Sequence, residues 1–240
     1  MTTLYARELD HRALNEAIRQ AGESVRITGC LGQRFIGAGM SGKRIEIGGI
    51  PGNALGAYLN GADITVDGNA QDAVGDTMNG GRIVVRGSIG DAAGYAMRGG
   101  RIFVRDDAGY RAGIHMKEYR DKVPLIVIGG CAGSFLGEYQ AGGVIVVLGL
   151  HAEGRRIVGD FPCTGMHGGR MFLRGNCAGI VFPPQVTARE ASAGELEAIR
   201  GAVEEFAALF GMDAAELLAA PYTVVTPDSA NPYRRMYAEN

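Results

Sequence analysis

The chain repeats itself every 19 residues, and this period constrains its fold more than any other feature. Four strand-like triplets, at residues 45–47, 64–66, 83–85 and 102–104, follow one another at that step. A second position in each unit is a glycine, and the same spacing relates Gly37, Gly56, Gly75, Gly94 and Gly113. The triplets continue after 24, 19 and 26 residues at positions 126–128, 145–147 and 171–173. We therefore predict about eight repeats between residue 24 and about residue 181.

A unit of this length is too short to hold a strand and a full helix. It suits one turn of a right-handed parallel β-helix, an all-β fold in which each turn pairs with the next at ~4.8 Å. Two apolar columns are predicted to fill the interior: Ile45, Ile64, Ile83, Ile102, Ile126, Ile145 and Met171, and Ile47, Val66, Val85, Val104, Ile128, Val147 and Leu173. Sharp corners need backbone with positive φ. The predicted structural turn glycines are Gly37, Gly56, Gly75, Gly94, Gly113 and Gly137.

Helical segments are predicted at both ends of the coil, so the chain divides into three parts. Residues 1–23 form an N-terminal helical cap, residues 24–185 the glycine-repeat β-helix, and residues 186–240 a C-terminal helical tail with an extended end. The N-terminal helix is expected over about residues 10–21.

The C-terminal tail carries clear helix signals. Ser192 and Glu195 have the spacing of a capping box, and apolar residues then recur at helical intervals up to Gly211. A second short helix is expected to begin at Asp213 and to end before Pro221.

Composition and charge exclude several classes of protein. Glycine accounts for 39 of 240 residues, yet 46% of the residues are hydrophobic and no collagen-like triplet period occurs. The net charge of −2 gives no attraction to nucleic acid or to an anionic membrane. No run of 18 apolar residues exists, and the first residues lack the apolar core of a signal peptide. We expect a cytoplasmic protein that binds neither nucleic acid nor a membrane.

The residues alone predict no catalytic, cofactor-binding or metal site. The glycine turns have the spacing G-x-x-G-x-x-x-G, which is not that of a dinucleotide fold, and no helix has room to follow them. The four cysteines form no C-x-x-C pair. His151, Cys163 and His167 are residue types that bind zinc, but no helix fixes their geometry, so a metal is not expected there.

Two insertions interrupt the period, at residues 115–124 and 150–164, and both are expected to project from the coil as loops. Loops of this kind often carry function. The candidate partner-contact residues are Lys117, Glu118, Tyr119, Arg120 and Lys122 in the first loop and Arg155 and Arg156 in the second. The ordinary alternative is that both loops are only solvated.

One outward column of the predicted strands is apolar over its last five turns. The column is Glu46, Thr65, Val84, Phe103, Val127, Val146 and Phe172. An apolar stripe of this length needs a cover, which could be the helix that follows Ser192 or a partner subunit. We favour the helix because it is tethered to the coil. Its Glu195, Glu204 and Glu205 would then lie near the arginines that flank the stripe, Arg82, Arg86, Arg101 and Arg105.

Three segments resemble the glycine-repeat (GXGXG) β-helix domain of the large subunit of glutamate synthase. They are GIPGNALGAYLNGADITVDGNAQDAVGDTMNGGRIVVRG at residues 49–87, YQAGGVIVVLG at 139–149 and GDFPCTGMHGGRMFLRG at 159–175. We expect the domain to be a separate subunit here, similar to the separate subunits of archaeal-type glutamate synthases and N-methylglutamate synthases. The repeats are also similar to those of the scaffold subunit of formylmethanofuran dehydrogenase, which is the alternative.

The resemblance implies a non-catalytic structural subunit. Its partners would be a glutamine amidotransferase subunit and an FMN-dependent synthase subunit, with FMN and an iron–sulfur cluster on the partner and no cofactor in this chain. Together they would transfer an amine to 2-oxoglutarate. In the family the third segment contains R-N-F-A-A-G-M-S-G-G, whereas residues 159–169 are GDFPCTGMHGG. This departure leaves ammonia, methylamine and other amines open as the nitrogen source.

Overall fold

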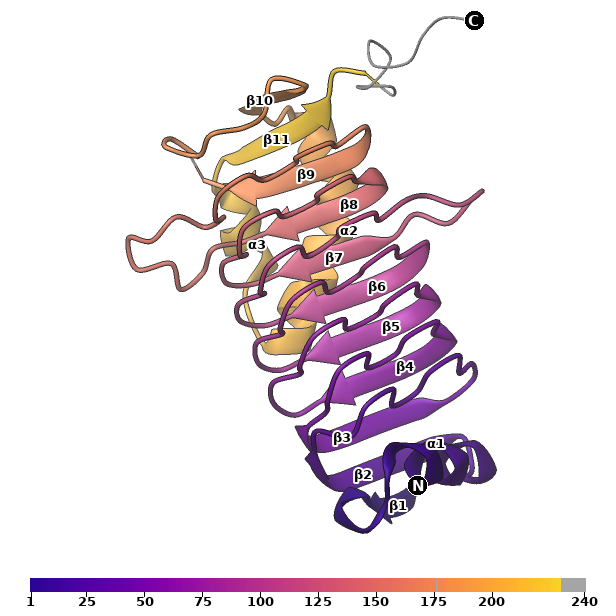
Figure 1. Ribbon diagram of the computed structural model, residues 1–240. Helices are drawn as coiled ribbons and strands as arrows, with labels where there is room; N and C mark the ends of the chain where they lie inside the picture. The colour runs from indigo at the N-terminus through magenta and orange to yellow at the C-terminus, as the bar shows by residue number, and fades with distance from the viewer. Residues whose placement is uncertain (176, 230–240) are drawn as a thin grey trace, which may run out of the picture.

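The protein, in a computed structural model that describes residues 1–175 and 177–229, is a β-solenoid with a helical segment at each end (Figure 1). Within these residues one eleven-stranded sheet has the order β1-β2-β3-β4-β5-β6-β7-β8-β9-β11-β10. The strands are β1 (Thr2–Tyr5), β2 (Ser24–Leu31), β3 (Arg44–Ile50), β4 (Asn60–Val66), β5 (Asn79–Val85), β6 (Gly99–Val104), β7 (Leu125–Ile128), β8 (Ala141–Val147), β9 (Gly168–Arg174), β10 (Val186–Glu190) and β11 (Tyr222–Pro227). The predicted all-β parallel solenoid is confirmed. Residues 230–240, the end of the predicted C-terminal tail, lie outside the residues that the structure describes.

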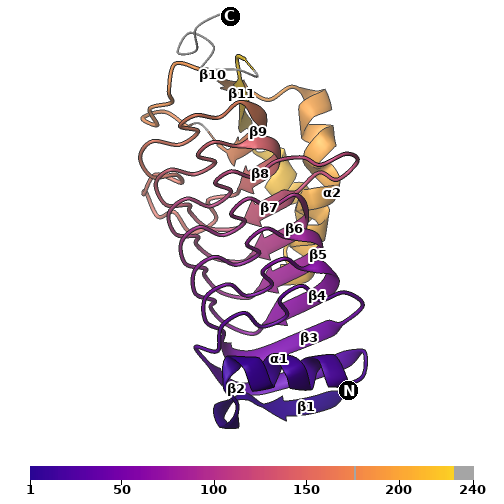
Figure 2. The ribbon, with the colours of Figure 1, turned by 45° about the vertical axis from the view of Figure 1, so that its right-hand side comes forward.

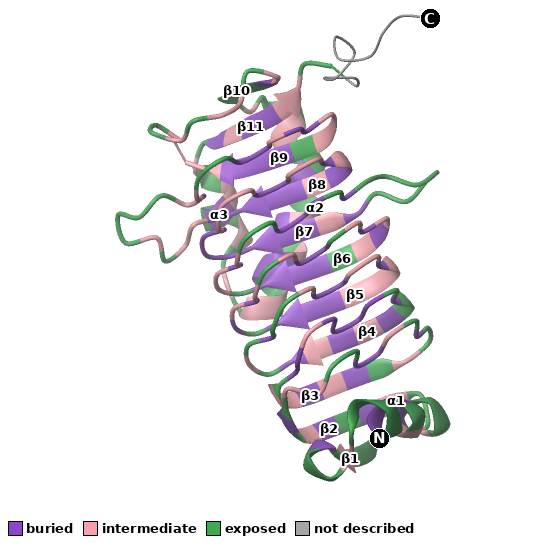
Figure 3. Cartoon of the chain, viewed as in Figure 1, coloured by how far each residue is buried: buried purple, intermediate pink, exposed green. Residues whose placement is uncertain are grey.

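The register of the sheet follows the sequence period. Ile45 pairs with Ile64, which pairs with Ile83 and then Ile102, and the second column pairs in the same way. The longer steps do not disturb this register, because Ile102 still pairs with Ile126. Every residue of the two predicted columns is fully buried. Figure 3 shows this burial running along the strands from one end of the solenoid to the other.

Each turn has three sides, and all three carry hydrogen bonds to the neighbouring turn. Besides the main sheet, a short parallel ladder joins Ala70, Ile89, Ala108, Ala132 and Val158. The third side consists of the segments 34–39, 53–58, 72–77, 91–96, 110–115, 134–139 and 160–165, which we call the turn face. Its backbone bonds are short and regular, as the 2.7–2.8 Å bonds from the amides of Gly56, Gly75 and Gly94 to the preceding turns show.

The turn glycines sit where a side chain would enter the core. Gly94 has a φ of +67°, and a Cβ there would lie 2.5 Å from Cδ1 of Ile126. The other five predicted turn glycines also have positive φ, and each faces an interior isoleucine or methionine in the same way. Glycine is therefore required at each of these corners for two reasons. The backbone has a positive φ, and a Cβ would overlap an interior side chain.

The N-terminal end is closed by a strand as well as by the predicted helix. The helix α1 (His11–Gln20) begins at the N-cap Asp10 and buries Leu14 and Ile18. Asn15 Oδ1 accepts a 3.0 Å bond from the amide of Gly37, which has no preceding turn to bond to. Strand β1, which the sequence did not predict, pairs in parallel with β2, and a 3₁₀ turn (Ala6–Glu8) connects it to the helix.

The solenoid has about seven turns rather than the predicted eight. Beyond β9 the chain makes no further parallel turn, because β11 returns antiparallel to β9 and β10 pairs antiparallel with β11. These two strands were not predicted. They cap the last turn by reversing direction, which ends the parallel stacking.

The apolar stripe is covered by the chain's own helix, as predicted. The helix α2 (Ala193–Phe210) begins with the capping box of Ser192 and Glu195 and ends at Gly211, and α3 (Ala214–Ala219) follows. Figures 1 and 2 show α2 against the sheet, on the side away from the coil turns. A second core lies between them, formed by Val84, Phe103, Val127, Val146, Leu148, Phe172, Ile199, Val203, Phe206, Ala207, Leu217, Tyr222 and Val224.

Only one of the three predicted acidic contacts with the flanking arginines forms. Glu205 pairs with Arg82 at 3.2 Å and with Arg101. Glu195 pairs instead with Arg189 on β10, and Glu204 lies 4.0 Å from Arg200 on its own helix. That part of the prediction was wrong, because these two carboxylates have arginine partners closer at hand, on β10 and on α2 itself.

Candidate functional site

The first inserted loop is a short hairpin at the start of β7. Tyr119 and Lys122 form an antiparallel bridge, and the ring of Tyr119 lies 5.3 Å below the guanidinium of Arg120. Two contacts tie the hairpin to the coil: Glu118 Oε1 accepts a 3.0 Å bond from the amide of Gly143, and Lys122 Nζ donates to the carbonyl of Asn79. All five candidate residues of this loop, from Lys117 to Lys122, are exposed.

The second inserted loop follows the C-terminal end of β8, whereas the first precedes the N-terminal end of β7. Arg155 Nη1 lies 3.5 Å from Asp107 Oδ2, and Arg156 Nη2 lies 2.7 Å from Asp160 Oδ1. Both arginines are exposed and line a shallow cavity of about 350 Å³ together with Cys131. Figure 1 shows the two loops projecting on opposite sides of the solenoid, from opposite ends of the strands. The seven candidate contact residues therefore form two separate groups.

Most of the exposed or partly exposed aromatic residues gather on the turn face. Seven of the chain's 9 tyrosines and 8 phenylalanines lie there, with His115: Phe35, Tyr58, Tyr95, Tyr110, Phe135, Tyr139 and Phe161. Tyr58 is 59% exposed and Phe161 is 63% exposed. Several rings contact those of the next turn, with centroids 5.1 Å apart for His115 and Tyr139 and 5.3 Å apart for Phe135 and Phe161. The result is a surface of stacked rings.

Six of these side chains have left-handed backbone. They occupy two positions, two residues before and two residues after the turn-glycine position, which is Cys163 in the last turn. Their φ values lie between +52° and +61°: Phe35, Phe135 and Phe161, and Tyr58, His115 and Tyr139. A residue with a Cβ costs ~1–2 kcal/mol in this conformation. Sequence reasoning missed this surface, although aligning these two columns on the turn glycines would have revealed rings where corners normally carry small residues.

Carboxylates of the coil hold the amides of the following turn. Asp72 Oδ1 accepts a 3.0 Å bond from the amide of Asp91, and Asp91 Oδ1 accepts a 2.8 Å bond from the amide of Tyr110. Asp107 repeats the arrangement with Cys131 on the adjacent side. These aspartates stabilise the stacking, and the second carboxylate oxygen of Asp107 faces Arg155.

The histidines and cysteines of the second insertion are not arranged as a metal centre. Among the described residues no group of three or more His, Cys, Asp or Glu side chains is placed to hold an ion. Cys163 is fully buried, donates to the sulfur of Met171 at 3.7 Å and occupies the turn-glycine position of the last turn. Burial raises the pKa of its thiol to about 12, so it is not a thiolate at neutral pH.

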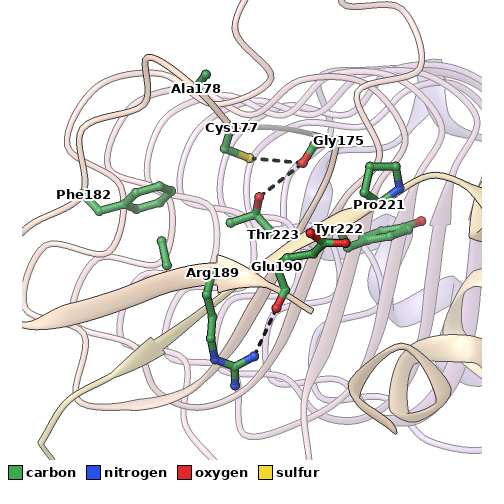
Figure 4. Close-up of a pocket in the computed structure, with 10 residues that line it drawn as sticks. Gly175, Cys177, Ala178, Phe182, Arg189, Glu190, Pro221, Tyr222 and Thr223 are labelled. Atoms are coloured by element: carbon green, nitrogen blue, oxygen red, sulfur yellow. Dashed lines mark hydrogen bonds between the residues drawn. The ribbon is translucent and has the colours of Figure 1, made fainter. Parts of the chain in front are cut away.

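A hollow of about 560 Å³ lies at the C-terminal end, between the segment that contains Cys177 and the β10–β11 pair (Figure 4). Thr223 donates a 3.2 Å bond to the carbonyl of Gly175, and Cys177 donates to the same carbonyl. Arg189 donates to the carbonyl of Glu190 and forms two 2.8 Å bonds with Glu195. The side chains of Cys177, Arg189 and Thr223 are therefore engaged within the chain.

This architecture defines a glycine-repeat parallel β-solenoid. The GXGXG motif family model matches residues 10–228, and the chain belongs to that family. It is 41% identical over 246 residues to the uncharacterised protein MJ1350 of Methanocaldococcus jannaschii, covering 97% of this chain and 94% of the relative.

A solved structure shares the fold. It is the formyltransferase/hydrolase complex (FhcABCD) of Methylorubrum extorquens with methylofuran, in which one chain matches with a TM-score of 0.65 and 22% identity. The match covers 86% of this chain and 74% of that one. Within the described residues, no helix combines the length and the apolar character needed to cross a bilayer.

Proposed function

We propose that this protein is a structural subunit that holds the other subunits of a multi-subunit enzyme complex in place. The observation that carries the proposal is the concentration of exposed rings in left-handed conformation on one side of a GXGXG-family solenoid. Aromatic residues are enriched at protein–protein interfaces and among the residues that dominate binding energy. The chain contributes an extended rigid surface, and chemistry belongs to the subunits bound to it.

The complex that we favour is glutamate-synthase-like. The proposal is supported by the likeness of residues 49–87, 139–149 and 159–175 to the corresponding glutamate synthase domain. Its partners are a glutamine amidotransferase subunit and an FMN-dependent synthase subunit that carries FMN and an iron–sulfur cluster, and this chain binds neither cofactor. The two inserted loops add contacts at opposite ends of the strands. One loop contains Lys117 to Lys122, and the other contains Arg155 and Arg156.

A second candidate is the scaffold subunit of a formyltransferase or formyl-dehydrogenase assembly. It is favoured by the fold shared with a chain of the formyltransferase/hydrolase complex. At 22% identity this likeness concerns the fold alone, so it ranks second.

Isolation of the tagged chain from its native source tests the proposal. We expect stoichiometric co-isolation of a glutaminase with an N-terminal cysteine and of a flavoprotein, and formation of glutamate from glutamine and 2-oxoglutarate with a reductant. Formyltransferase or molybdopterin subunits in their place would establish the second candidate. A chain that is isolated without stoichiometric partners would contradict both.

A further inference from the structure

Several rings of the turn face contribute little to the stability of this chain. Tyr58 and Phe161 are more than half exposed, so they bury little apolar area within the molecule. In other turns the same two columns hold Gly39 and Ala73, residues that have little or no side chain to place. Strained conformations that bring little internal packing beyond ring stacking are typical of functional surfaces. The sequence thus keeps rings at positions where a smaller residue would fold more easily.

No other described segment of the chain covers this face beyond its first turn. The helix α2 packs on the opposite side of the sheet (Figure 2), and the two inserted loops leave from the ends of β7 and β8. At the N-terminal end α1 approaches the first turn, where the rings of His11 and Phe35 are 6.1 Å apart. The following turns present their rings to the outside.

The charge of the face is acidic. The seven segments contain five carboxylates and two arginines, and one arginine, Arg111, is already paired with Glu138 at 3.0 Å. Asp72 and Asp91 are exposed and bond to backbone amides, and Asp76 accepts from the hydroxyl of Thr77. None of these three aspartates forms an ion pair within the described residues. The unpaired carboxylates therefore lie on two adjacent turns, between the turns that carry Tyr58 and Tyr110.

Arg111 shows within the chain how such a surface binds a cation. Its guanidinium lies 4.7 Å from the ring centroid of Phe135 and at the same time pairs with Glu138. Guanidinium groups stack on aromatic faces and form directional bonds with carboxylates, whereas phosphates are repelled by an acidic surface. Turns that repeat at ~4.8 Å offer the same pair of partners several times along one line.

We infer that the turn face docks an arginine-bearing segment of a partner protein, whose guanidinium groups stack on the exposed rings and pair with Asp72, Asp76 and Asp91. The inference rests on the proposed scaffold function and adds to it the surface used and the chemistry of the partner. The opposite face, closed by α2, takes no part in this contact.

The first arm of the test removes rings without harming the fold. Tyr58→Gly and Phe161→Gly together should lower the affinity of the chain for the co-isolated partner subunits about tenfold. The melting temperature of the isolated chain should change little, because glycine relieves the left-handed strain at both positions and this offsets the lost stacking of Phe161 on Phe135. The matched control, Ala73→Gly with Ala92→Gly, relieves similar strain on the same face without deleting a ring and should leave affinity unchanged.

The second arm removes charge and keeps the backbone bonds. Asp72→Asn and Asp91→Asn retain the oxygen that accepts from the next turn, and they should weaken association and reduce its dependence on salt. Glu23→Gln, an exposed carboxylate outside the face, serves as the control. Hydrogen exchange in the native complex should slow at residues 53–58 and 110–115 relative to the isolated chain.

The outcomes separate this inference from the proposed function. If the co-isolated partners are formyltransferase subunits and hydrogen exchange slows on the turn face, the glutamate-synthase assignment is overturned and the docking inference stands. Full affinity of the ring variants, with unchanged exchange on the face in an otherwise expected complex, would overturn the docking inference alone. A dimer of the isolated chain that the ring variants dissociate would assign the face to a second copy and also overturn it.

Discussion

Replacement of Gly94 by alanine should destabilise the solenoid through two effects that can be measured separately. The added Cβ would lie 2.5 Å from Cδ1 of Ile126, and the backbone would remain at a φ of +67°. Ile126 is fully buried and held in its column between Ile102 and Ile145, so its methyl group has little room to move. We expect ~1–2 kcal/mol from the conformation and ~1–3 kcal/mol from overpacking.

A double-mutant cycle isolates the overpacking. Ile126→Val removes the obstructing methyl group and by itself should cost ~0.5–1.5 kcal/mol. The double variant should lose less free energy of unfolding than the two single variants together, by ~1–2 kcal/mol. Gly39→Ala supplies the control for conformation alone, because its φ is also +67° and a Cβ there would have no heavy atom within 4 Å.

Urea denaturation followed by far-UV circular dichroism measures all four proteins and the control, with the m-value checked for constancy. The reasoning is refuted if Gly94→Ala costs no more than Gly39→Ala, or if the cycle is additive. Either result would mean that the interior adjusts around the extra carbon, and that the turn glycines are needed only for their backbone conformation.

Three further predictions concern the helix, the first loop and the cap of α2. Phe103→Asp, under α2, should cost ~3–5 kcal/mol in a denaturation experiment, whereas Thr65→Asp in the uncovered part of the same column should cost less than ~1 kcal/mol; equal costs would contradict the cover. Deleting residues 118–122, the five that exceed the 19-residue period, should leave the circular dichroism unchanged and weaken assembly with the partner subunits; undiminished assembly would show that the loop is only solvated. Hydrogen bonds from Arg189, and then from Ser192, lower the pKa of Glu195 from 4.5 to about 2, so the stabilisation is complete above pH 4.5 and is lost as the pH falls toward 2. In Glu195→Gln the decline in melting temperature over that range should flatten, and an unchanged decline would assign the acid sensitivity to other groups.

The sequence alone determined the repeating part of the protein. Residues 19 apart become neighbours in adjacent turns, so the interior columns, the register of β3 to β9 and the turn glycines could all be predicted from local periodicity. The longer, 24-residue step to Ile126 did not affect the predicted register. The inserted residues leave the coil at a corner, and the next strand resumes the pairing. The helices at both ends were also predicted, since capping residues such as Asp10 and Ser192 are local signals.

Tertiary structure decided how the ends close and which surfaces remain free. Strands β10 and β11 lie more than 30 residues apart in the chain, and nothing in either segment indicates that they pair with each other and with β9. The two inserted loops are close in sequence yet lie on opposite sides of the solenoid. One precedes the strand β7 and the other follows the strand β8, so they leave from opposite ends of the parallel strands. The rings of the turn face belong to columns on either side of a glycine, and only stacking of the turns brings them together. The sequence period specifies the contacts that each turn makes with the next turn. Whether an end or a face of the solenoid stays exposed depends on which distant segment of the chain packs against it.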